Sequence, residues 1–132
     1  VRRLPQLLEA KIHVRKEYLK AFRGTPLRLL GENRETFPAW LNVVLFPKPI
    51  TDRAKLKKLA ESLHGSGFQV RPAFPAVTDY PMYRMAANFS LAHENELFHR
   101  GLCLPSGAAV QPSDVHLLSG LLLERAREFD LI

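Results

Sequence analysis

The stretch ELFHRGLCLPSG, residues 96–107, contains a helix end, a glycine, a short apolar run and a turn in close succession. Gly101 is a stop signal for the helical residues before it, and the turn at residues 105–107 ends the apolar run. We therefore expect residues 102–104 to form a very short strand between a helix and a turn.

Cys103 is the only cysteine of the chain, and it lies between Leu102 and Leu104. A catalytic thiol needs thiolate character, from a neighbouring base or a helix N-terminus, and access to solvent. Apolar neighbours on both sides instead predict burial. His99 lies on the preceding helix, and nothing in the sequence brings its imidazole to the sulfur. We expect Cys103 to be a packed core residue, and we assign no catalytic residue to this chain.

A long helix is predicted over residues 4–22, with Gly24 as the stop signal after it. Its expected inner face is apolar at helical spacing and consists of Leu4, Leu8, Ile12, Leu19 and Phe22. Arg15 is the one residue that interrupts this stripe. So long a helix at the start of a small domain predicts packing against something beyond this chain.

The rest of the chain alternates between strand and helix patterns. AWLNVVLF, residues 39–46, is rich in β-branched and aromatic residues and predicts a central strand. The elements expected after it are a helix capped by Thr51 with the inner face Leu56, Leu59, Ala60 and Leu63, a strand over residues 68–74, a helix capped by Ser90, and a last helix opened by Ser113. This order predicts an α/β fold, an α+β sandwich in which helices cover a small antiparallel or mixed sheet.

The composition is that of an ordinary folded domain. The 132 residues include 46% hydrophobic residues, enough to bury one core. A single cysteine excludes an internal disulfide framework and fits a reducing compartment. No apolar run is long enough to span a bilayer. Because the chain begins at Val1 without a methionine, we expect it to be a piece of a longer protein.

The net charge of the chain is positive, with 19 Lys and Arg residues against 13 Asp and Glu residues. Such a surface suits anionic partners, although it is also what a solvated helix face looks like. The densest cluster, Lys55, Lys57 and Lys58, alternates with leucines as on an amphipathic helix. A small basic module that binds nucleic acid or a phosphorylated partner, without catalysis, is therefore the alternative function.

Metal and nucleotide-loop motifs are not found in the sequence. The histidines have no metal-ligand spacing, since His93 and His99 are six residues apart, so no metal site is expected. The chain has no GxGxxG, GxxxxGK[ST] or GxSxG motif.

The loop FPAVTDYPMYRMAAN, residues 74–88, is long for a compact domain, and loops of this length are often functional. The residues with donors or aromatic faces in and beside it are Arg71, Asp79, Tyr80, Tyr83 and Arg84. Arginine forks and tyrosine rings suit an anionic ligand that carries a ring. The opposing interpretation is that the loop covers the core with Phe74, Tyr80 and Met82. The sequence alone leaves these two alternatives open.

Several motifs together resemble one family. In chain order they are AWLNVVLF, DRAKLKKLAESLHGSGFQVRPAF, YPMYR and LFHRGLCLPSG, followed by the closing helix. This series resembles the C-terminal part of the DegT-type sugar-nucleotide aminotransferases, which are pyridoxal-phosphate (PLP) enzymes of the aspartate-aminotransferase fold. LPQLLEAKIHVRKEYLKAF resembles the family's helix between the large and small domains. The resemblance thus implies a linking helix over residues 1–24 and a small domain over residues 25–132.

The resemblance implies an enzyme that transfers an amino group, usually from glutamate, to a nucleotide-linked keto sugar, most similar to those that aminate a UDP-4-keto sugar for surface glycans. PLP and its Schiff-base lysine would belong to a large domain outside this chain, so the chain would hold no cofactor and would not be catalytic alone. The complete enzyme would be a cytoplasmic homodimer that has the nucleotide sugar as a partner but neither a membrane nor nucleic acid.

The substrate site implied by the resemblance includes the loop. Its residues here are Arg71, Thr78, Asp79, Tyr80, Tyr83 and Arg84. The family often has Pro-Leu-His where this chain has Ala76-Val77-Thr78. The hydroxyl of Thr78 can donate a hydrogen bond to a phosphate but cannot carry the charge of an imidazolium, so the departure puts ordinary substrate binding in doubt.

Overall fold

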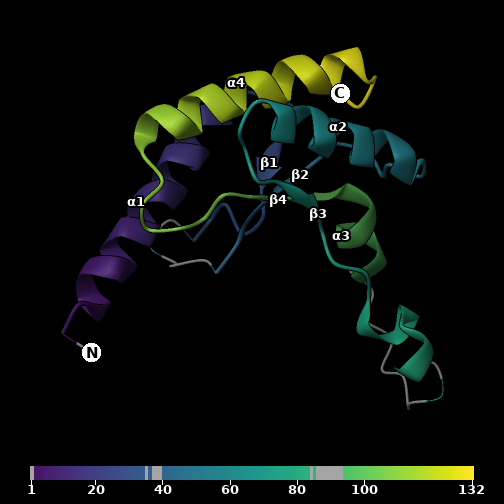
Figure 1. Cartoon of the computed structure of the whole chain (residues 1–132), viewed down its shortest axis with the longest axis horizontal. Helices are drawn as coiled ribbons and strands as arrows, with labels where there is room; N and C mark the ends of the chain where they lie inside the picture. Colours follow the sequence, from purple (N-terminus) through teal and green to yellow (C-terminus); the bar gives the residue numbers. More distant parts are fainter. Residues whose placement is uncertain (1, 35, 37–39, 84, 86–93) are drawn as a thin grey trace.

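The computed structural model describes residues 2–34, 36, 40–83, 85 and 94–132. In these ranges the elements are α1 Leu4–Ala21, β1 Arg28–Leu29, β2 Asn42–Leu45, α2 Arg53–Gly65, β3 Arg71–Pro72, the 3-10 turns η1 Val77–Asp79 and η2 Pro81–Tyr83, α3 Glu94–Arg100, β4 Gly101–Leu104 and α4 Pro112–Glu128. The four strands form an antiparallel sheet in the order β1-β2-β4-β3 (Figure 1). The predicted α/β class is confirmed.

Strand β4 holds the sheet together because it pairs on both sides. Cys103 lies opposite Val43 of β2 on one side and Arg71 of β3 on the other. Two backbone hydrogen bonds extend this pairing, from Phe46 N to Arg100 O at 2.9 Å and from Ala73 N to Gly101 O at 2.9 Å. The expected very short strand is thus present, and it begins at Gly101, one residue earlier than predicted.

The central strand predicted over residues 39–46 is confirmed as β2, although within the described residues it covers only Asn42–Leu45. The strand predicted over residues 68–74 is much shorter, Arg71–Pro72. Proline lacks the N–H that a longer ladder would need. Before β3, Val70 N donates to Phe68 O at 3.1 Å, which is a local turn and not a strand bond.

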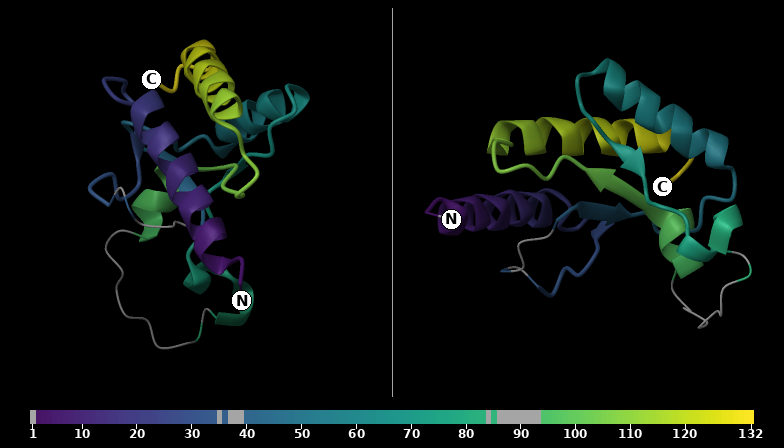
Figure 2. Two further views of the ribbon diagram at one scale, coloured as in Figure 1. Left: turned by 90° about the vertical axis from the view of Figure 1, so that its left-hand side faces the viewer. Right: turned by 60° about the horizontal axis from the view of Figure 1, so that its bottom comes forward.

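Helices α1, α2 and α4 cover one face of the sheet, as Figures 1 and 2 show from three directions. The buried residues between these helices and the sheet are apolar and include Val44, Leu102 and Leu104 from the strands and Leu56, Leu59, Leu63, Val115, Leu118 and Leu122 from the helices. The predicted inner face of α2 is confirmed, since Leu56, Leu59, Ala60 and Leu63 are all buried.

Two predicted helix caps were wrong by one or two residues. Asp52, not Thr51, caps α2, because its carboxylate accepts from Ala54 N at 2.9 Å. Helix α4 begins at Pro112 after Gln111, and not at Ser113; the carboxylate of Asp114 accepts from Gln111 N at 3.0 Å. In both cases a short acidic side chain satisfies a free N–H at the helix start. Ser90, the predicted cap of α3, lies outside the described residues.

The inner face of α1 is not the apolar stripe that the sequence predicts. Leu4 and Leu8 are 51% and 38% exposed, whereas Val14, Tyr18 and Phe22 are buried. Arg15, the residue that interrupts the predicted stripe, is 2% exposed. The helix therefore contacts the sheet through a partly polar face on its second half, and its first half extends past the sheet (Figure 2).

Arg15 binds backbone carbonyls of the segment that follows β1. Its Nε donates to Arg34 O at 3.0 Å and its Nη2 donates to Leu30 O at 2.9 Å and to Gly31 O. Its Nη1 is 3.4 Å from the side-chain oxygen of Asn42. No carboxylate pairs with Arg15 among the described residues, and burial lowers the pKa of its guanidinium. In the described part of the chain, its hydrogen-bond acceptors are all carbonyl oxygens.

Two neighbours of Arg15 on α1 bind the turn after β4. Lys11 Nζ donates to Ser106 O at 2.7 Å, and Tyr18 Oη donates to Pro105 O at 3.0 Å. Lys11, Arg15 and Tyr18 are spaced four and three residues apart, so they share one side of the helix. We call these three side chains the α1 clamp.

Ser106 connects the α1 clamp to the sheet through hydrogen bonds. Its buried hydroxyl accepts from Asn42 N at 2.7 Å and donates to Leu104 O at 2.7 Å. Asn42, which starts β2, thus contacts both Ser106 and Arg15. The turn after β4 is therefore hydrogen-bonded to both β2 and α1.

Gly101 occupies a position that no other residue fits. A Cβ atom there would lie 2.6 Å from Ala73 Cβ and 2.7 Å from Leu97 O. Both contacts are too short for carbon, and the second is with backbone that cannot move without shifting α3. The glycine lets β4, the end of α3 and the residue after β3 approach one another closely.

We expect Gly101→Ala to lower the free energy of unfolding by about 2 kcal/mol or more, because the added methyl group overpacks a rigid site. The matched control is Gly120→Ala, in the exposed middle of α4, where an added Cβ meets nothing within 4 Å. That change should raise stability by about 0.5–1 kcal/mol. Urea unfolding measures both, and an equal response of the two variants would contradict the packing argument.

We expect Arg15→Met to cost about 2–4 kcal/mol, because the carbonyls of Leu30, Gly31 and Arg34 lose a charged donor. Lys16→Met changes the neighbouring exposed residue and should alter stability by less than about 0.5 kcal/mol. Thermal or urea unfolding is the measurement. A variant at residue 15 as stable as the parent would show that Arg15 contributes nothing to the stability of the fold.

Candidate functional site

Residues 73–83, which we call the arm, leave the sheet edge after β3. Figure 1 shows this segment extending away from the sheet and the three covering helices. The two 3-10 turns are closed by backbone hydrogen bonds from Asp79 N to Ala76 O at 3.0 Å and from Tyr83 N to Tyr80 O at 2.9 Å. The sequence predicted an irregular loop here, and the turns give the arm a local order that was not expected.

The arm does not cover the core. Phe74, Tyr80 and Met82 are 51%, 39% and 72% exposed. The interpretation in which these three side chains close the core is therefore wrong. Among the arm residues whose burial is described, only Ala76 is buried. An extended segment with several large exposed side chains is a candidate interaction surface.

The predicted site residues are only partly brought together. Arg71 lies in β3 with its guanidinium carbon 5.7 Å from the centre of the Phe74 ring. Asp79, Tyr80 and Tyr83 lie on the two turns and are exposed. Among the described side chains, no hydrogen bond joins Arg71 to any of these three residues. Thr78 is part of η1, but its side chain and the whole of Arg84 lie outside the described residues.

These groups supply binding chemistry and no evident catalytic pair. A guanidinium donates in a fork to phosphate or carboxylate, and a phenol presents a ring face and a hydroxyl. The carboxylate of Asp79 accepts hydrogen bonds from hydroxyl groups, such as those of a sugar. The exposed arm can therefore line one wall of a site whose other wall it does not provide.

Cys103 is a core residue, as predicted. Cys103 is only 3% exposed. Burial raises the pKa of its thiol, and the charge of nearby Arg71 partly offsets this rise. No hydrogen bond connects Cys103 with His99, although both are described. Without thiolate character or access, the thiol does not have the properties of a nucleophile.

The described residues do not by themselves form a site for a cofactor or a metal ion. None of the seven lysines, all of which lie in the described ranges, is buried, and a Schiff-base lysine needs a protected site. These residues therefore do not by themselves fit PLP. Within the described part of the chain, no three His, Cys, Asp or Glu side chains are grouped to hold a metal ion, and no helix has both the length and the apolarity to cross a membrane.

The α1 clamp and its partners Asn42 and Ser106 were missed by sequence reasoning. The signal was the spacing of Lys11, Arg15 and Tyr18, which places two cations and a phenol on the side of a helix that also carries buried apolar residues. The acceptors are mostly backbone carbonyls, which leave no trace in the sequence. The clamp holds the first helix against the domain that carries the arm.

Solved structures of sugar aminotransferases have the same fold. PseC of Helicobacter pylori, an aminotransferase of pseudoaminic acid biosynthesis, superposes with a TM-score of 0.77 at 17% identity over 96% of this chain and 34% of its own. Spr1654 of Streptococcus pneumoniae, described as a "putative sugar aminotransferase" and solved in its PMP form, gives 0.80 at 14% identity over 96% of this chain and 32% of its own. DesI, solved with its TDP-sugar product, gives 0.73 at 20% identity over 98% and 34%.

The chain spans about a third of the length of these solved structures. The sequence itself matches the DegT/DnrJ/EryC1/StrS aminotransferase family over residues 1–120, which is most of the 132 residues. The family resemblance read from the motif series is thus confirmed. This chain belongs to the DegT/DnrJ/EryC1/StrS aminotransferase family.

Proposed function

We propose that this chain is the C-terminal lobe of a PLP-dependent aminotransferase, which transfers an amino group from glutamate to a nucleotide-linked keto sugar. The observation that carries the proposal is the exposed arm, with Asp79, Tyr80 and Tyr83, beside Arg71 of β3, on a chain of a sugar-aminotransferase family. The solved product complex of DesI with a TDP sugar supports a nucleotide sugar as the substrate class.

The proposed division is a linking helix over residues 1–24 and a small domain over residues 25–132. Two features of α1 support it. The first half exposes Leu4, Leu7 and Leu8, which are 51%, 50% and 38% accessible. The second half is held to the domain by the clamp. A helix that is fixed at one end and apolar at the other suits the role of joining this lobe to a large PLP-binding domain.

PLP is the proposed cofactor of the complete enzyme, where it supplies the electron sink for transferring the amino group. Because no lysine of this chain is buried, we assign the lysine and the cofactor's other contacts to the large domain. The lobe itself would bind and orient the sugar nucleotide. By the same family relation, we place the enzyme in the cytoplasm as a homodimer that makes an amino sugar for a surface glycan, with a UDP-4-keto sugar as the substrate.

Each residue of the proposed site, in the arm or in β3, has a role that follows from its chemistry. The guanidinium of Arg71 pairs with a phosphate of the nucleotide in a forked geometry. Tyr80 and Tyr83 stack on a ring or donate a hydrogen bond, and Asp79 accepts one from a sugar hydroxyl. The hydroxyl of Thr78 donates to a phosphate but supplies no charge. A large domain that faces the arm would exclude water from these contacts and strengthen them.

We expect Arg71→Ala in the complete enzyme to raise KM for the nucleotide sugar about tenfold or more, a loss of about 1.4 kcal/mol of binding, with KM for glutamate unchanged. Steady-state kinetics with each substrate varied in turn measure the effect.

The control for this prediction is Lys58→Ala, which removes an exposed cation from α2 and should change neither constant. Thermal unfolding of both variants tests that the fold is intact. If Arg71→Ala alters neither KM, or alters both equally, then the arm does not bind the nucleotide sugar as proposed.

A further inference from the structure

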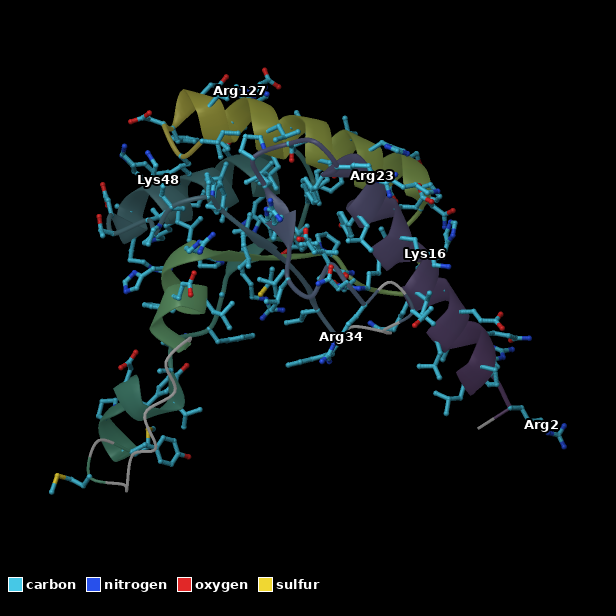
Figure 3. The ribbon with its side chains drawn as sticks, turned by 180° about the vertical axis from the view of Figure 1, so that it is seen from behind. Arg2, Lys16, Arg23, Arg34, Lys48 and Arg127 are labelled. Atoms are coloured by element: carbon cyan, nitrogen blue, oxygen red, sulfur yellow. The ribbon has the colours of Figure 1, made fainter. Side chains whose placement is uncertain are left out.

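A basic groove lies along the C-terminal end of α1. Two hollows meet there and share Leu19 and Arg23. The larger has a volume of about 330 Å³ and also includes Thr25 and Arg28, and the smaller is lined by Lys16 and Lys20 as well. We call this surface the α1–β1 groove. Figure 3 shows Lys16 and Arg23 along the same helix.

The groove and the arm lie at opposite edges of the sheet. Strand β1, which carries Arg28, is one edge of the sheet, and strand β3, which carries Arg71, is the other. The strands β2 and β4 lie between them. A ligand in the groove therefore does not belong to the site proposed for the nucleotide sugar.

The groove has an excess of positive charge. Lys20 pairs with the carboxylate of Glu17 at 2.7 Å, and Arg28 pairs with that of Glu32 at 2.9 Å. Lys16 and Arg23 have no ion-pair partner among the described residues, so four cations face two carboxylates, and two positive charges are left over.

The buried carboxylate of Glu17 is already paired with Lys20, so it does not neutralise the charges of Lys16 and Arg23. Its hydrogen bond with Lys20 holds its pKa below the usual range, with charge from His13 and His116 as a smaller contribution. His116 also approaches Glu17 to 3.7 Å from α4. Glu17 is thus satisfied on the inner side of the helix.

Some of the carbonyls at the C-terminal end of α1, where the helix dipole disfavours an anion, accept hydrogen bonds from the chain itself. Tyr18 O accepts from Phe22 N at 3.0 Å and Lys20 O accepts from Arg23 N at 3.2 Å. Phe22 O accepts from both the N–H and the hydroxyl of Thr25, at 3.1 and 2.9 Å. These bonds occupy carbonyls that would otherwise carry the helix's partial negative charge into the groove.

We propose that the α1–β1 groove binds a diphosphate group of a small molecule. Lys16, Lys20 and Arg23 are four and three residues apart and lie on one side of α1, over about 10 Å of helix. Arg23 and Arg28 supply forked donors, and Lys16 supplies a compact charge, a combination that fits adjacent phosphates. The volume of the larger hollow is at the lower end of that of small-molecule sites.

A small diphosphate fits the groove better than a nucleic acid. Binding of single strands uses exposed aromatic side chains on which bases stack. The exposed aromatic residues described in this chain are Trp40, Phe74, Tyr80 and Tyr83, and none of them lines the groove. Phe22, which does line it, is 4% exposed and has no free ring face for a base.

The test is calorimetric titration of inorganic pyrophosphate into the protein at low salt. We expect saturable binding with one site, weakened at least tenfold in the double variant K16A/R23A. The charge-matched control is K58A/R127A, which removes one exposed lysine and one exposed arginine elsewhere and should change the affinity by less than twofold. Thermal unfolding in the absence of pyrophosphate checks that both double variants keep the parent stability.

Three results would overturn the proposal: no saturable binding, equal losses in the two double variants, or binding of a 20-base-pair DNA duplex without binding of pyrophosphate. Arg71→Ala separates the groove from the arm. If Arg71→Ala removes pyrophosphate binding while K16A/R23A retains it, the anion binds at the arm; the groove proposal then fails, and the proposed aminotransferase function does not.

Discussion

The fold depends on a buried cation, Arg15, that pairs with no carboxylate among the described residues. Arg15 satisfies its guanidinium with the carbonyls of Leu30, Gly31 and Arg34, so the long helix and the segment after β1 must fold together. Leaving either partner without the other would bury unpaired polar groups at a cost of about 1–3 kcal/mol each. Together with the burial of Val14, Tyr18 and Phe22, this requirement fixes where α1 lies against the sheet, whereas the first apolar residues of the helix are exposed.

The stretch at residues 96–107 is important because its strand β4 pairs with two neighbouring strands, and not because the thiol of Cys103 is reactive. Strand β4 has a neighbour on each side, and Gly101 lets Ala73 and Leu97 approach it. Ser106 then fastens the end of the strand to β2 and, through the clamp, to α1. The arm begins directly after β3, the strand that β4 holds in place, so the candidate site is positioned by the same short segment.

The sequence predicted the helices, the central strand and the α/β class because periodic apolar residues, glycines and prolines are strong local signals. It predicted the buried thiol from its leucine neighbours. The prediction failed where the role of a residue depends on backbone that is distant in the sequence. Arg15 was predicted only to interrupt the apolar face of the first helix, and β3 was predicted as a longer strand over residues 68–74. The site was predictable as a group of residue types in a long loop, but not as an exposed arm, because exposure depends on what the rest of the fold leaves uncovered.

The acceptors of Arg15 have a consequence for how this chain can diverge. A carbonyl is present whatever side chain the residue carries, so positions 30, 31 and 34 keep their contact with the helix through most substitutions that preserve the local backbone. Selection would then act on a single arginine and on the path of the main chain, and not on the identity of the partners. Anchoring of this kind would let the fold of this chain persist while the side chains at these three positions change.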